Sequence, residues 1–102
     1  MYLVHTHLEL PRGKQLPSDV RALVRSAILP GDRVEHVAVH PRSTSALTLG
    51  FYVVAGALDE AEERAVRVCA RLLGDVPQLS SARLTGAGVP LQPLAFGPQP
   101  VD

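Results

Sequence analysis

Four histidines are the residues of this sequence whose type and spacing could do chemistry at neutral pH. His5 and His7 lie two residues apart near the start, and His36 and His40 lie four apart further along the chain. Imidazole titrates near neutral pH and binds transition metals, so such side chains serve as acids, bases or metal ligands. The elements that carry the histidines decide whether they can meet.

Segment 34–54 predicts a β-hairpin, because two runs of alternating apolar and polar residues flank the turn 41–45. The alternation puts valine, leucine and phenylalanine on one face and the histidines on the other. If the turn closes simply, its length fixes which residues of the two strands face each other. The expected cross-strand pairs are His36 with Gly50 and His40 with Ala46.

The chain before the hairpin predicts one strand and one helix. Residues 2–10 alternate with period two, which indicates a strand carrying His5 and His7 on its polar face. Apolar residues at helical spacing predict an amphipathic helix over residues 20–28, with Ser18 as its N-cap.

A second amphipathic helix is predicted over residues 58–72, with Leu58 at the start of its buried stripe. Asp59 and Glu62 have the spacing of a capping box, and Gly74 is suited to the position just after the helix.

The C-terminal quarter predicts a weaker strand over residues 79–85. The apolar segment 89–96 contains prolines, which restrict it to an extra edge strand or an extended arm. Residues 97–102 are expected to form a flexible C-terminal tail.

This order of elements predicts an α+β fold, the ferredoxin-like βαββαβ sandwich, as a single domain over residues 1–96. Its antiparallel sheet would have strand order 4-1-3-2, with both helices on one face. The other face would be open and would carry all four histidines. Part of this open face is expected to form an interface with another molecule. The residues of that expected interface are Leu3, Val34, Ala38, His40, Thr48, Gly50, Tyr52 and Val54.

A divalent-metal site is one hypothesis for the open face. Side chains at positions i and i+2 of a strand lie about 6.8 Å apart on one face, a spacing found in strand-borne metal ligands. The candidate ligands are His5 and His7, with His36 across Gly50 and Glu9 as an oxygen donor. No other cofactor is predicted.

Acid–base catalysis is a second hypothesis, with His36 and Tyr52 as the candidate catalytic residues beside a groove at Gly50. The order of elements over residues 1–96 resembles the dimeric α+β barrel superfamily, although no family motif matches residue by residue. That resemblance implies a homodimer formed by paired open sheet faces. The superfamily includes small cofactor-independent monooxygenases and polyketide cyclases of natural-product chemistry.

The charge composition indicates which classes of partner are unsuited to this chain. Ten basic and ten acidic residues give no net charge, which argues against nucleic-acid binding and against a polybasic membrane surface. Cys69 is the only cysteine, so no internal disulfide can form, and a cytoplasmic location is expected.

The sequence therefore predicts a non-catalytic binding or accessory module that homodimerises through its open, histidine-bearing sheet face. A small molecule or another protein remains a further candidate partner. The alternatives are a small enzyme of the dimeric α+β barrel type and a histidine-based metal-binding protein, so enzymatic activity stays an open question at this point.

Overall fold

The computed structural model describes residues 1–89 of the chain. In chain order its elements are β1 (Tyr2–Glu9), α1 (Val20–Ser26), η1 (Pro30–Asp32), β2 (Val34–Pro41), β3 (Ala46–Val53), α2 (Leu58–Asp75), η2 (Pro77–Leu79) and β4 (Arg83–Gly88). The segments η1 and η2 are single 3-10 turns. The predicted arm and tail, from residue 90 onward, lie outside the described residues.

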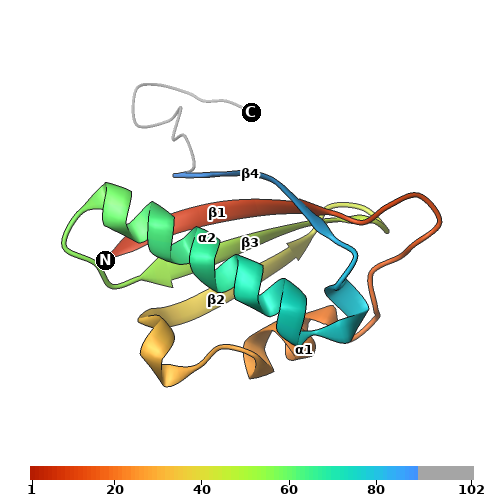
Figure 1. The fold of residues 1–102 in the computed structure, drawn as a ribbon, viewed down its shortest axis with the longest axis horizontal. Helices are drawn as coiled ribbons and strands as arrows, with labels where there is room; N and C mark the ends of the chain where they lie inside the picture. Colours follow the sequence, from red (N-terminus) through yellow and green to blue (C-terminus); the bar gives the residue numbers. More distant parts are fainter. Residues whose placement is uncertain (90–102) are drawn as a thin grey trace.

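The four strands form one antiparallel sheet in the order β2-β3-β1-β4. Counted from the β4 edge, that order is 4-1-3-2. Figure 1 shows the long helix α2 crossing the sheet and the short helix α1 beside β2, and side chains from both helices enter one hydrophobic core. The predicted α+β architecture is confirmed.

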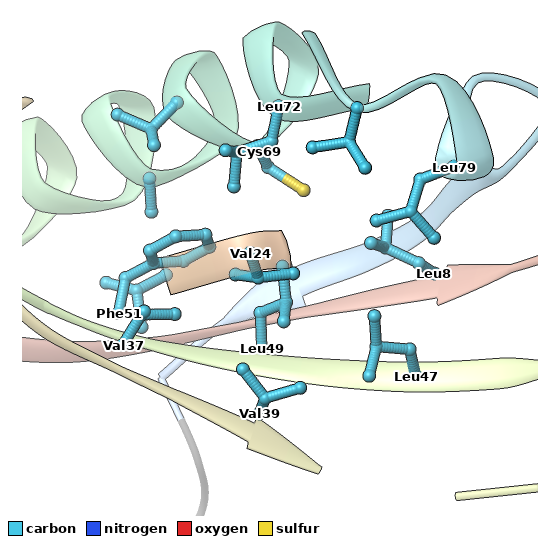
Figure 2. Close-up of a cluster of buried hydrophobic side chains, with 14 of the residues drawn as sticks. Leu8, Val24, Val37, Val39, Leu47, Leu49, Phe51, Cys69, Leu72 and Leu79 are labelled. Carbon is cyan, nitrogen blue, oxygen red and sulfur yellow. The ribbon is translucent and has the colours of Figure 1, made fainter. Parts of the chain in front are cut away.

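The core lies between the sheet and the helices. Figure 2 shows α2 above the sheet with Cys69 and Leu72 directed towards it, and α1 contributes Val24. Alternate residues of the three longer strands fill the other side of this layer, because successive side chains of a strand point to opposite faces. The core residues contributed by these strands are Val4, Leu8, Val37, Val39, Leu47, Leu49, Phe51 and Val53.

One polar pair interrupts the core. Thr6 and Cys69 are both fully buried, and Thr6 Oγ1 has no hydrogen-bond partner of standard geometry among the described residues. Burial raises the pKa of the Cys69 thiol, and the adjacent Thr6 hydroxyl opposes this only in part. Cys69 is therefore a small residue of the core.

Replacing Thr6 with valine should leave stability unchanged or raise it by up to about 1 kcal/mol, because valine has a similar shape and removes a buried hydroxyl that makes no hydrogen bond of standard geometry within residues 1–89. Urea denaturation of the wild-type protein and the Thr6→Val variant measures this. A loss of more than about 1 kcal/mol would show that the hydroxyl makes a stabilising hydrogen bond.

Both helices differ from prediction at their ends. Helix α1 begins at Val20 after Asp19, so Ser18 is not its N-cap, and it ends at Ser26. Helix α2 has Ala57 at its N-cap, without the predicted capping box, and it extends through Asp75, so Gly74 lies inside the helix rather than just after it.

Two other contacts stabilise the start of α2. The Glu60 carboxylate accepts a hydrogen bond from the Gly56 backbone N–H at 3.1 Å, and Asp59 Oδ1 accepts one from the Glu60 N–H. The Gly56 bond and Arg64 hold the pKa of Glu60 below its usual value. Leu58, predicted to be buried, is 42% exposed.

The fourth strand begins later than predicted. Leu79 ends η2 as a buried core residue, and strand pairing starts only at Arg83. Pro77 cannot donate to a sheet ladder, which favours a turn at this point. Within residues 1–89 no helix is long and apolar enough to cross a membrane.

Candidate functional site

The sheet face opposite the helices is called the open face here. Cross-strand partners point to the same side of a sheet, so the pairings identify its members. They are Leu3, His5, His7, Glu9, His36, Ala38, His40, Ala46, Thr48, Gly50, Tyr52, Arg83, Gly86 and Gly88. All four histidines of the chain lie on this face, as the alternation predicts.

The register of the hairpin differs from the predicted one by two residues. His36 pairs with Tyr52 rather than Gly50, and His40 pairs with Thr48 rather than Ala46. The turn sets this register, since the Ala46 carbonyl accepts the Arg42 N–H at 2.8 Å. A shift of two residues keeps every side chain on its predicted face but changes its neighbours.

The predicted position of Val34 is wrong. It was expected on the open face, but it pairs with Val53 and packs against the core. A β-bulge at Glu35 adds one residue to β2 between Val34 and His36, which moves Val34 to the helix side. Val54 follows β3 and is 38% exposed.

The open face is arranged in four cross-strand rows. The first row crosses β2, β3 and β1, the second and third cross all four strands, and the fourth crosses β3, β1 and β4. In this order, the rows are His36–Tyr52–Leu3, Ala38–Gly50–His5–Gly88, His40–Thr48–His7–Gly86 and Ala46–Glu9–Arg83. His5 and His7 thus occupy the two middle rows.

Glycine neighbours leave room beside the two central histidines. The imidazole of His5 lies over Gly50, where a Cβ atom would be 3.3 Å from His5 Cδ2 and 3.3 Å from Leu3 Cδ1. The predicted groove at Gly50 is therefore occupied by these two side chains. On the other side, a Cβ at Gly86 would lie 3.6 Å from His7 Cδ2.

Among the described residues, the His7 side chain makes a hydrogen bond and the His5 side chain makes none. His7 Nδ1 lies 2.9 Å from Thr48 Oγ1, on the neighbouring strand. The rings of His5 and His7 are nearly perpendicular, with centroids 6.3 Å apart. Burial lowers the pKa of His5, and the neighbouring His7 and His40 lower it further.

His36 and Tyr52, the candidate catalytic pair, are neighbours. Their ring centroids are 5.6 Å apart with the rings tilted by 45°. A pocket of about 200 Å³ adjoins His36, but it opens towards α1 and Tyr52 does not line it. Within residues 1–89 the structure therefore brings the two side chains together, and the pocket beside His36 is not shared with Tyr52.

The four candidate metal ligands do not meet. His36 lies in the first row, two strands away from β1, while Glu9 lies in the fourth row, 3.9 Å from Arg83. Within residues 1–89 no group of three or more histidine, cysteine or acidic side chains is close enough to hold a metal ion. Of the four candidates, His5 and His7 are the two that lie side by side, with ring centroids 6.3 Å apart.

The sequence interpretation missed the contribution of β4 to this face. Gly86 and Gly88 pair with His7 and His5, and Arg83 pairs with Glu9. A bulge at Thr85 lets the glycines share the face with the histidines. The usable signal was the alternation of Gly86 and Gly88 itself, since glycine in a strand often marks a close approach by another group.

Comparisons with protein-family models, with curated proteins and with solved structures find no match for this chain. A functional assignment therefore rests on the chemistry of the open face.

Proposed function

We propose that this protein is a non-catalytic interaction module that homodimerises through its open face. In this proposal the βαββαβ arrangement is a ferredoxin-like sandwich, and two such sheets pack face to face as in the dimeric α+β barrels. The observation that supports it most strongly is the composition of the open face, which no helix of residues 1–89 covers.

The open face is suited to contact with an identical surface. With the histidines neutral, its ionised side chains among the described residues are Glu9 and Arg83, which adjoin each other at one margin. The remaining positions are apolar, small or neutral, and Leu3, Ala38 and Tyr52 are only half-buried in the single chain. A two-fold dimer presents the same patch on both partners, so a face without unpaired charge can pack on itself.

A charge placed in the middle of this face tests the proposal. Ala38 lies beside Gly50 in the second row, and Ala38→Glu would bring one unpaired carboxylate from each partner into the interface. We expect the dissociation constant of the dimer to rise at least about 100-fold, because each uncompensated buried charge costs several kcal/mol. Sedimentation velocity over a range of concentrations measures this constant.

Ala70→Glu is the matched control, since Ala70 is exposed on α2. It makes the same substitution on the helix side and should leave the dimer intact. A wild-type protein that remains monomeric at micromolar concentration in the presence and absence of divalent metal, or equal dimer affinity of the two variants, would contradict the proposed interface.

An enzyme of the dimeric α+β barrel type is the second candidate, favoured by the contact between His36 and Tyr52. A dimer through the open face would enclose both side chains, and a histidine paired with a phenol can transfer protons near neutral pH. This function requires a cavity of at least about 300 Å³ beside both residues in the dimer. A crystal structure of the dimer with a filled interface there would exclude it.

A further inference from the structure

We infer that His5 and His7 form one half of a divalent-metal site of the zinc class, which a second copy of this chain completes across the open face. This inference rests on the proposed dimer. It differs from the site expected within one chain, because His36 and Glu9 take no part.

The position of the two histidines on the sheet is the first argument. The open face is four strands wide, and its middle lies between β3 and β1. His5 and His7 extend from β1 in the two middle rows, within about one strand spacing, or about 5 Å, of that middle. When two copies pack face to face, a two-fold axis that lies between the two sheets and passes over the middle of the face brings both histidines of each copy towards those of the other.

The spacing of the rings is the second argument. Two imidazoles bound to one tetrahedral zinc ion, with Zn–N distances of about 2.1 Å, have centroids about 5 Å apart. The centroids of His5 and His7 are 6.3 Å apart, so a small rotation of the side chains would bring both rings to that distance. Gly88 and Gly86, the partners of these histidines on β4, place no side chain against the two rings.

The contact with Thr48 is the third argument. With its proton on Nδ1, His7 donates a hydrogen bond to Thr48 Oγ1 and keeps a free lone pair on Nε2. Metal-binding histidines commonly donate their second ring N–H in this way, which fixes the tautomer and the orientation of the ring. Thr48 is thus a positioning residue for the site.

The number of ligands explains why two copies are needed. Two imidazoles from each chain give four nitrogen ligands, which is the usual coordination number of zinc in proteins. Imidazole also binds cobalt and nickel, so Co²⁺ is a suitable spectroscopic probe. The expected stoichiometry is one ion for every two chains.

The experiment uses the full chain, first treated with EDTA and then titrated with Co²⁺ and with Zn²⁺. We expect binding to end at one ion per two chains, with the visible absorption of tetrahedral Co²⁺ and a tighter dimer. His5→Ala and His7→Ala should each abolish binding. Thr48→Val should weaken it about 10-fold or more. Ala70→Glu, on the exposed side of α2 and outside the open face, should bind as the wild type does.

Two results would overturn the inference: no saturable binding, or one ion per chain without a change in the dimer. Sedimentation in EDTA separates this outcome from the proposed function. A metal-free dimer that binds no ion contradicts the inference and leaves the proposed interface standing. A chain that stays monomeric with and without metal contradicts both. Circular dichroism shows whether each variant is folded.

Discussion

Leu72→Ala is expected to destabilise the protein by about 2 to 5 kcal/mol, the largest effect of any substitution considered. Leu72 is 1% exposed, at the centre of the layer where α2 packs on the sheet (Figure 2). Truncating a buried leucine removes its transfer free energy and leaves a cavity. Alanine is the better helix former, so helix propensity does not contribute to this loss. Guanidinium denaturation followed by circular dichroism measures the change.

Leu58→Ala is the matched control, because it makes the same substitution in the same helix. Leu58 is 42% exposed at the first turn of α2, and its truncation should cost less than about 1 kcal/mol. An equal loss for both variants would mean that α2 does not pack on the sheet along the face described here.

Asp32→Ala is expected to cost about 2 to 3 kcal/mol, because hydrogen bonds to a charged group are stronger than neutral ones. The Asp32 carboxylate accepts hydrogen bonds from Arg71 Nη1 at 3.0 Å and Nη2 at 2.8 Å, and from the Leu29 backbone N–H at 2.7 Å. Arg71 also donates to the Ala27 carbonyl. The Asp32–Arg71 pair therefore connects η1, the end of α1 and helix α2.

Glu63→Ala is the comparison for this ion pair. Glu63 faces Arg67 at 3.7 Å with both side chains largely exposed, so its removal should change stability by less than about 0.5 kcal/mol. Thermal unfolding of the two variants in the same buffer checks the difference. Equal losses of stability for Asp32→Ala and Glu63→Ala would show that the Asp32 contacts are no stronger than a surface ion pair.

The faces of the strands could be predicted from the sequence, and the neighbours of each residue could not. Alternation assigns a residue to a face, and it placed His5, His7, His36 and His40 correctly. A register shift of two residues leaves that assignment unchanged, so alternation cannot detect it. The turn decides it, through hydrogen bonds of the Ala46 carbonyl that composition does not reveal.

The bulge at Glu35 is visible in the sequence as a change in the spacing of the valines. Val34 and Val37 are three residues apart, whereas Val37 and Val39 keep the spacing of two. A change of spacing inside a strand indicates an extra residue, which returns the chain to the same face one position later. Reading that change would have placed Val34 in the core.

The ligands of the candidate metal site also depend on cross-strand neighbours, which alternation does not predict. The types of residue were visible in the sequence, but the ligand set depended on which strands lie between them. His36 was expected across Gly50 from β1, whereas the row that contains Gly50 holds Ala38 and His5. Only the cross-strand rows reduce four candidate ligands to the pair His5 and His7.

The place of β1 in the sheet has a consequence for synthesis of the chain. This strand precedes both of its partners in the chain, which are β3, at residues 46–53, and β4, at residues 83–88. Its backbone groups therefore have no sheet partner until much of the chain has been made. Pairings so distant in sequence slow folding, because the entropy of closing a long loop is lost before the stabilising contacts form. β1 should therefore gain protection from hydrogen exchange only after β3 has been made, and β4 should follow it, because its single partner in the sheet is β1.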